Sequence, residues 1–370
     1  MDSALLAGLV MSVALGLSIA LVPPVRVLAR RWGVMDEPGE RKVHAVAMPR
    51  LGGLGVFAAF NAVVVAGFAL APRLAELPWV RTHFEGIVTQ LQEAHRVEAK
   101  LLAVVSGAAV AFGVGLLDDI LGTRFPVWAK ALGQVLATLL LIAAGVQTSF
   151  MPYEWMNAVV TFLWVVGMTN AFNLLDNMDG LAAGVACVAS GVLLLNAWAL
   201  GEVFISLILV AFIGSLLGFL VFNFQPASIF LGDCGSLFIG YLMGSLTLLE
   251  RYVSHASSGF FPVLMPVLVL AVPLMDTVTV VVIRLRERRP IYVGDSRHLS
   301  HRLVSLGFSQ RAAVLFLYLV TFCFGLGAAS LTDATPLQAY MILLQSVGFV
   351  ALLFVLLFFE RRRKPRGPAR

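Results

Sequence analysis

The chain has 370 residues, of which 59% are hydrophobic and 13% charged, and its formal net charge is +5. This composition lies outside the range of soluble globular domains and argues against a soluble enzyme. Apolar runs of about 20 residues, the length of helix that crosses a hydrocarbon core of about 30 Å, recur along the whole chain. We therefore expect an all-α, polytopic integral membrane protein.

Eleven apolar segments are long enough to cross a membrane, and the connections between them are short. The first has no basic residue before it and no small-residue cleavage site behind it, which favours a retained helix over a removed signal peptide. The sequence predicts one transmembrane domain over residues 1–360 and a basic tail at 361–370. The predicted spans are 4–23, 51–71, 101–117, 126–146, 155–174, 181–199, 203–222, 231–249, 262–283, 312–330 and 338–359.

The distribution of basic residues predicts the orientation of these spans. Arg26, Arg30 and Arg31 follow the first span, which places the N-terminus outside and residues 24–50 in the cytoplasm. With eleven spans the C-terminus is cytoplasmic, and 21 of the 26 Lys and Arg residues then lie on the inner side. The net charge is thus explained by topology and requires no nucleic-acid partner.

Polar residues gather at the inner ends of the predicted spans. DEPGERKVHAVAMPRLGG follows the first span, GLLDDILG ends the third, and NAFNLLDNMDG ends the fifth. FNFQPASIFLGDCGS joins the seventh to the eighth, and RHLSHRL follows the ninth, which itself contains an Asp. The residues concerned are Arg41, Lys42, His44, Asp118, Asp119, Lys130, Asn173, Asp176, Asp179, Asn223, Asp233, Asp276, Arg297, His298, His301 and Arg302.

A single Asp at a helix end is usually a solvated interfacial residue or an N-cap, and this is our interpretation of Asp2 and Asp333, and of Asp119 taken alone. The set as a whole calls for another explanation. An ionisable side chain at the centre of a transmembrane helix costs about 2.5–3.5 kcal/mol and persists mainly where it serves a site. Several such residues, all on one side of the membrane, predict a shared cytoplasmic cavity.

The residue types indicate what this cavity binds. Asn173, Asp176 and Asp179 are three residues apart and share one helix face if the helix continues through them. Oxygen ligands without Cys or His suit a hard cation such as Mg2+, with Mn2+ as a substitute, although a proton or sodium relay in a transporter would also use carboxylates. The neighbouring Arg, Lys and His residues favour a site that handles phosphate.

In their order along the chain these motifs resemble those of the polyprenyl-phosphate N-acetylhexosamine-1-phosphate transferases. The resemblance extends from about residue 33 to about residue 309, and the number of spans is similar to that of the branch that makes lipid-linked N-acetylglucosamine. The resemblance implies that a polyprenyl phosphate attacks the β-phosphorus of a UDP-N-acetylhexosamine at the cytoplasmic face of the inner membrane. UMP leaves, Mg2+ assists, and the lipid-diphospho-sugar starts a cell-envelope polysaccharide. A homodimer is a further expectation by analogy.

The resemblance also implies roles for individual residues. Asp233 and Asn173 are expected to bind the metal, and the candidate catalytic carboxylates are Asp118, Asp119, Asp176 and Asp233. Asp118 is the candidate for orienting or deprotonating the lipid phosphate. Asp179 is expected to face the uracil and Phe230 to stack on it. The further candidates for contacts with the phosphates or the sugar are Arg41, Lys42, His44, Lys130, Asn223, Asp276, His298, His301 and Arg302.

One departure from the family pattern affects the choice of sugar. The branch in question usually carries HIHH in the last cytoplasmic loop, whereas this chain has HLSH, with Ser300 at the third position. Transferases of phospho-N-acetylmuramoyl-pentapeptide usually have consecutive His residues there, so that substrate is an alternative that the motif argues against. A membrane CDP-alcohol phosphotransferase is a further alternative, but DGLAAG lacks the Arg of the motif of those enzymes, which argues against it. An ion-coupled transporter remains the alternative of another class, but it would place its carboxylates nearer the bilayer midplane.

Overall fold

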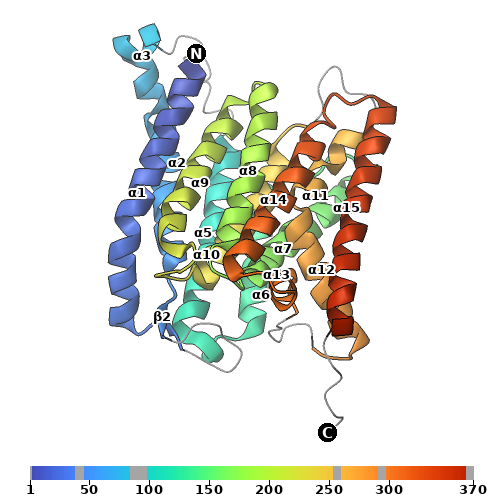
Figure 1. Ribbon diagram of the computed structural model, residues 1–370. Coiled ribbons are helices and arrows are strands. Elements are labelled where there is room, and N and C mark those ends of the chain that lie inside the picture. Colours follow the sequence, from blue (N-terminus) through green and yellow to red (C-terminus); the bar gives the residue numbers. More distant parts are fainter. Residues whose placement is uncertain (1, 38–45, 84–97, 253–259, 291–296, 364–370) are drawn as a thin grey trace. The chain divides into compact units, whose positions relative to one another are not determined.

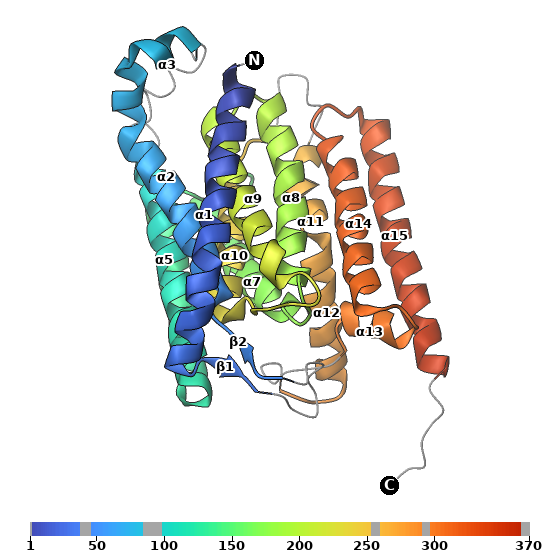
Figure 2. The same cartoon turned by 60° about the vertical axis from the view of Figure 1, so that its left-hand side comes forward.

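The computed structural model describes residues 2–37, 46–83, 98–252, 260–290 and 297–363, and these form an almost entirely helical chain (Figures 1 and 2). The chain divides into two compact units, Met1–Arg251 and Tyr252–Arg370, each described below by itself. The described residues thus confirm the predicted all-α, polytopic class. The prediction of one catalytic domain over residues 1–360 stays a prediction.

Unit 1 is a bundle in which α10 is the central helix. It packs against α5, α7, α2 and α8, while α1 packs along α9 and α2. A two-stranded antiparallel pair, β1 (Met35–Asp36) and β2 (Met48–Pro49), lies between α1 and α2 in the chain. The helices are α1 (Asp2–Trp32), α2 (Gly52–Glu76), α3 (Pro78–His83), α5 (Glu98–Leu121), α6 (Val127–Ala143), α7 (Glu154–Leu175), α8 (Leu181–Ala199), α9 (Val203–Asn223) and α10 (Gly232–Leu249).

Unit 2 contains a bent helix pair and two long helices. The segments Phe261–Val269 and Ala271–Arg286 meet at 70°, within the predicted span 262–283. Pro273 lies in the first turn of the second segment and has no N–H to continue the hydrogen-bond ladder of the first, which accounts for the break. The helices are α11 (Met265–Val269), α12 (Ala271–Arg286), α13 (Leu299–Ser305), α14 (Gln310–Ala329) and α15 (Pro336–Arg363).

Each of the eleven predicted spans coincides with a helix or with the bent pair. Among the described residues, nine helices are long and apolar enough to cross a membrane, and the bent pair brings the number to ten if it forms one span. The remaining segment, α6, is a shorter apolar helix. The structure therefore confirms a multi-pass membrane protein, while the count of eleven and the orientation stay predictions.

Small residues let α10 lie very close to its neighbours. Every residue of α10 from Cys234 to Thr247 is buried. A Cβ on Gly53 of α2 would overlap the backbone of Gly235, and one on Gly115 of α5 would overlap the backbone of Asp233 and Cys234. Glycine at both positions therefore fixes the start of α10 between α2 and α5 at backbone contact distance.

We expect Gly115→Ala to destabilise unit 1 markedly. The added methyl group meets the Asp233 carbonyl, which cannot rotate away like a side chain, so α5 and α10 have to separate at a cost of about 1–3 kcal/mol. Thermal unfolding in detergent should show a lower apparent Tm. Gly113→Ala on the same helix is the matched control, because its Cβ meets nothing within 4 Å and alanine is the better helix former. Equal Tm values for the two variants would contradict the close packing.

Candidate active site

The end of α5 and the start of α10 bring three predicted carboxylates together in unit 1. Asp119 Oδ1 accepts a hydrogen bond from Asp233 N, and Asp119 Oδ2 accepts one from Cys234 N, both at 2.9 Å. The Asp119 side chain is 0% exposed. Asp119 is therefore neither solvated nor the cap of its own helix: it caps the first turn of α10, a different helix, where a negative charge is stabilised.

Lys130, at the start of α6, connects three helices. Its Nζ lies 2.8 Å from Asp118 Oδ2, 2.5 Å from Asp233 Oδ2 and 3.3 Å from Asn173 Oδ1. Asn173 Nδ2 donates to Asp233 Oδ1 at 3.1 Å and to Ser236 Oγ at 2.8 Å. We call Asp118, Asp119, Lys130, Asn173 and Asp233 the polar cluster. The side chains of Asp118, Lys130 and Asp233 are each about one-fifth exposed, so the cluster is partly accessible to solvent.

Arg50, which precedes α2, also reaches the polar cluster. Its Nη2 lies 3.1 Å from Asp119 Oδ1 and 3.5 Å from Asp233 Oδ1, and its Nη1 lies 3.7 Å from Asp36 Oδ1. Arg50 was not predicted as a site residue from the sequence, although it lies in the motif DEPGERKVHAVAMPRLGG. Backbone hydrogen bonds fix its position, because the segment before α2 pairs with the segment before α10: Phe230 N donates to Pro49 O at 2.8 Å, and Gly52 N donates to Phe230 O at 2.9 Å.

A second polar contact lies one turn further into the bundle. Gln134 of α6 and Asn170 of α7 exchange side-chain hydrogen bonds of 2.6 and 3.3 Å. Asn170 is three residues before Asn173 and thus lies on the same face of α7. Neither residue was named as a site residue from the sequence, because an amide within an apolar run carries no sign of its partner.

The helical strip predicted for Asn173, Asp176 and Asp179 is not formed. Helix α7 ends at Leu175, Asp176 is its C-cap, and Gly180 has φ +75°. The polar residues and glycine of DNMDG favour a turn over further helix, so the strip is corrected to a helix end followed by a turn. Burial, and next the nearby Asp233 carboxylate, raise the pKa of Asp176 to about 8.

The turn after α7 is fastened to the segment between α9 and α10. Asp179 Oδ2 accepts a hydrogen bond from Ala227 N at 3.1 Å, and Asn223 Oδ1 accepts one from Gly180 N at 3.0 Å. Asn223 Nδ2 donates to Ile229 O at 3.0 Å. The amide of Asn223 therefore holds two backbone segments, while Phe230, half-buried, ends the same segment. Asp179 and Phe230 thus lie on two segments that are joined by hydrogen bonds.

Unit 2 carries its own polar group. His298 Nδ1 lies 2.7 Å from Asp276 Oδ2, and Asp276 Oδ1 accepts a hydrogen bond from Leu299 N at 2.7 Å. Asp276 and His298 are buried. The His301 ring centroid lies 6.3 Å from that of His298, and burial, followed by His298, lowers the pKa of His301. Asp276 thus fixes the orientation of His298, as carboxylates do for functional histidines.

Other residues of the predicted site have different surroundings. Arg302 and Ser300 of α13 are buried, and Arg297 pairs with Glu287. Arg41, Lys42 and His44 lie outside the residues that the structure describes. A single cavity shared by the polar cluster and the residues of unit 2 stays a prediction.

The polar cluster has the donor atoms of a hard-cation site. Within the described part of the chain, no three His, Cys, Asp or Glu side chains form a metal-binding group. The Lys130 ammonium, however, is surrounded by oxygens of Asp118, Asn173 and Asp233. Two carboxylates and an amide fit Mg2+, which takes one or two carboxylates and completes its shell with water and phosphate oxygens. The residues present therefore fit this ion.

Comparison with known proteins identifies the family. Residues 101–250, which run from α5 to α10 and contain every member of the polar cluster, match glycosyl transferase family 4. The chain is 33% identical over 353 residues to a probable undecaprenyl-phosphate N-acetylglucosaminyl 1-phosphate transferase of Bacillus subtilis, covering 92% of this chain and 88% of that protein. A decaprenyl-phosphate N-acetylglucosaminephosphotransferase of Mycolicibacterium smegmatis is 32% identical over 370 residues, with 93% and 86% covered.

A more distant relative extends the same pattern. The undecaprenyl-phosphate alpha-N-acetylglucosaminyl 1-phosphate transferase of Escherichia coli strain K12 is 26% identical over 341 residues, covering 90% of this chain and 84% of that protein. These similarities span both units, whereas the family match covers only unit 1. The chain therefore belongs to glycosyl transferase family 4, in the branch of the polyprenyl-phosphate N-acetylglucosamine-1-phosphate transferases that its sequence motifs resemble.

Proposed function

We propose that this protein transfers phospho-N-acetylglucosamine from UDP-N-acetylglucosamine to a polyprenyl phosphate and releases UMP. An oxygen of the lipid phosphate forms a bond to the β-phosphorus, and the bond from that phosphorus to the bridging oxygen breaks, so that this oxygen leaves with UMP. The observation that carries the proposal is the polar cluster together with Arg50: carboxylates, an amide and two cationic side chains meet at one end of unit 1 in a chain of this family.

The cationic side chains would hold the two phosphate-bearing reactants together. Two anions repel each other, so positioning and electrostatic stabilisation supply most of the catalysis in phosphoryl transfer. Lys130 and Arg50 would move from Asp233, which lies 2.5 and 3.5 Å from them, onto phosphate oxygens as the substrates enter. Asp118, held by Lys130 at 2.8 Å, would then orient the lipid phosphate. A phosphate is already largely dianionic near neutral pH, its second pKa being about 6, so little deprotonation is needed.

Asp233 and Asn173 would hold the Mg2+ ion, or Mn2+ in its place. When bound, the ion would neutralise charge on the phosphate groups and on the departing UMP. Asp119, whose oxygens are engaged by Asp233 N, Cys234 N and Arg50, would act as a positioning residue for Asp233. In unit 2, His298 held by Asp276 would contact the diphosphate or the sugar, together with His301 and Arg302.

The distribution of charged residues supports a location for the reaction. The excess of Lys and Arg on the side to which Asp118 and Asp233 belong supports a cytoplasmic active site in the inner membrane. The product would be the first lipid-linked sugar of a cell-envelope polysaccharide. A homodimer remains a prediction by analogy.

Release of UMP by the detergent-purified protein tests this proposal. We expect turnover that requires undecaprenyl phosphate and Mg2+, with UDP-N-acetylglucosamine the best donor in a panel of UDP-N-acetylhexosamines that includes UDP-N-acetylmuramoyl-pentapeptide. A different best donor would overturn the choice of sugar alone. If folded protein turned over no donor at all, the transferase proposal would be wrong and the ion-coupled transporter would become the leading explanation.

Substitution of Asp179 tests its predicted contact with uracil. We expect Asp179→Ala to raise KM for the nucleotide sugar about tenfold and to change kcat less, because the contact binds ground state and transition state alike. Asp179→Asn separates this role from the hydrogen bond with Ala227 N. The variant keeps one oxygen that accepts from that N–H, and it replaces the second oxygen with an N–H2 donor. It should raise KM similarly at unchanged Tm. A wild-type KM in both variants would remove Asp179 from the nucleotide site.

A further inference from the structure

Unit 1 contains a large apolar groove at the end that faces away from the polar cluster. Asp118 lies near the end of α5, and Asp233 lies at the start of α10. The groove is lined at the opposite ends of these helices, by Lys100 at the start of α5 and Leu249 at the end of α10. Helix α9 likewise contributes residues from its beginning, Val203 onward. The volume of the groove is about 1000 Å3. It is thus a separate feature, at the upper limit of ordinary ligand pockets.

The groove is about as deep as one leaflet of a bilayer. Its lining on α2 runs from Ala62 to Leu74, which at about 1.5 Å per residue is about 18 Å of helix. Half of a hydrocarbon core of about 30 Å is about 15 Å. Leu9, Val13 and their neighbours on α1 face the same space. Figure 2 shows α2 leaning away from α1 toward the end that carries α3, and residues of both helices line the groove.

Among the residues that the structure describes, the charged residues that line the groove lie at one of its ends. Lys100, Glu202 and Arg251 are part of its lining, and Arg251 Nε pairs with Glu202 Oε1 at 3.0 Å. The Arg251 side chain remains 80% exposed. The two positive charges and one negative charge of these three residues make this end of the apolar groove net positive. This distribution is complementary to a molecule with an apolar chain and an anionic head.

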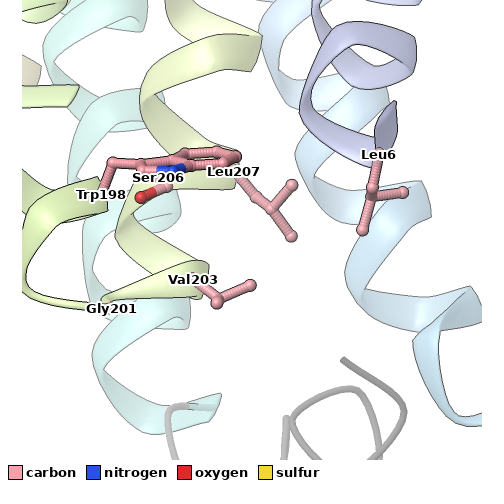
Figure 3. A pocket seen from close by; sticks show the side chains of 6 residues that line it. All are labelled: Leu6, Trp198, Gly201, Val203, Ser206 and Leu207. Carbon is pink, nitrogen blue, oxygen red and sulfur yellow. The ribbon is translucent and has the colours of Figure 1, made fainter. Parts of the chain in front are cut away.

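A small side pocket extends the apolar space between α1 and α9. Its volume is about 90 Å3, and four of its six lining residues, Leu6, Gly201, Val203 and Leu207, also line the groove. Figure 3 shows Leu6 of α1 across from Leu207 and Val203, with the indole of Trp198 beside Ser206. Such a pocket accommodates the end of an acyl chain and is too small for a head group.

We propose that the groove binds an anionic phospholipid of the adjacent leaflet. One acyl chain lies between α1, α2 and α9, and the phosphate contacts Lys100 and Arg251. The polyprenyl acceptor does not meet this description, because its phosphate has to reach the polar cluster at the opposite end of unit 1. The inference goes beyond the proposed function. Only the exclusion of the polyprenyl acceptor rests on that function, and the test measures lipid binding instead of turnover.

Native mass spectrometry of the full-length, delipidated protein tests this site. With phosphatidylglycerol and phosphatidylcholine of identical chains, we expect one lipid per chain to be retained, and phosphatidylglycerol to bind about tenfold more tightly. Lys100→Gln combined with Arg251→Gln should remove this preference. Arg73→Gln, an exposed basic residue of α2 outside the groove lining, is the matched charge control and should leave it intact.

A steric variant tests the acyl chain independently. Gly67 lines the groove and has open space beyond it, so Gly67→Leu should fill the slot and abolish retention of both lipids. Gly16→Leu on α1, also exposed and with nothing within 4 Å, lies outside the lining and should bind like the wild type. The proposal is overturned if Gly67→Leu retains lipid normally, if the two head groups bind equally well, or if polyprenyl phosphate displaces phosphatidylglycerol from the groove.

Discussion

Asp233→Asn is expected to remove nearly all turnover while leaving the protein inserted and folded. Asp233 accepts from Lys130 at 2.5 Å and from Asn173 at 3.1 Å, and it faces Arg50 at 3.5 Å. Asparagine has the same shape, so no cavity forms, but it carries no charge and turns an N–H2 group toward Lys130 or Arg50. We expect kcat to fall by at least about 100-fold, the size of effect seen when a group that stabilises transition-state charge is removed.

The Mg2+ dependence of this variant is the informative measurement. Rates of UMP release over a range of Mg2+ concentrations should show that high Mg2+ restores only part of the activity, because a carboxylate ligand has been lost. Asp333→Asn, an exposed carboxylate of unit 2 outside the predicted site, provides the control and should behave like the wild type. If Asp233→Asn kept most of the wild-type rate at limiting Mg2+, Asp233 would not be a metal ligand.

Asp119→Ala is the second substitution with a large expected effect. It leaves the buried N–H groups of Asp233 and Cys234 without acceptors, at about 1–3 kcal/mol each, and removes the nearest carboxylate from Arg50. The start of α10 should loosen, Tm should fall, and kcat should drop about 100-fold because Asp233 is no longer held in place.

Asp119→Asn separates positioning from simple stability. One amide oxygen still accepts one of the two N–H groups, so Tm should fall less than in Asp119→Ala, whereas the Mg2+ concentration for half-maximal activity should rise several-fold. A variant with lowered Tm but unchanged kcat and unchanged Mg2+ dependence would show that Asp119 only stabilises the bundle.

The helices and the carboxylates of the site could be predicted from the sequence for one physical reason. Apolar runs of about 20 residues specify transmembrane helices almost without regard to tertiary structure, and polar residues within them stand out against that background. The borders between apolar runs and polar residues predicted where α5 and α7 end and where α10 begins. The same reasoning also found Lys130, because a lone basic residue at the start of an apolar run is conspicuous.

The pairing of these residues could not be predicted in the same way. Asp119 and the N–H of Asp233 are 114 positions apart, and Arg50 and Asp233 are 183 positions apart. Such contacts depend on glycines that bring α2, α5 and α10 to backbone distance, and no local pattern encodes them. The turn that follows α7 was missed for a different reason: the three-residue spacing of Asn173, Asp176 and Asp179 suggested that the helix continues, whereas the turn residues of DNMDG end it.

The HLSH motif of unit 2 was found from the sequence, but its contact with Asp276 was not. HLSH was identified from the sequence as a candidate for substrate contact, and the role of each His stays a prediction. The buried pair of Asp276 and His298, at 2.7 Å, was not foreseen, since Asp276 was expected to contact substrate directly. Its buried carboxylate accepts from both His298 and Leu299 N, which favours a role in holding the loop.

The fate of the β-phosphate tests phospho-sugar transfer more directly than any other measurement. The purified protein would be incubated with undecaprenyl phosphate, Mg2+ and UDP-N-acetylglucosamine carrying radioactive phosphorus in the β position. We predict that the label appears in a lipid-diphospho-sugar, that the nucleotide product is UMP, and that both are lost without divalent metal and in Asp233→Asn. Release of labelled UDP, with the sugar transferred alone, would contradict phospho-sugar transfer at the polar cluster.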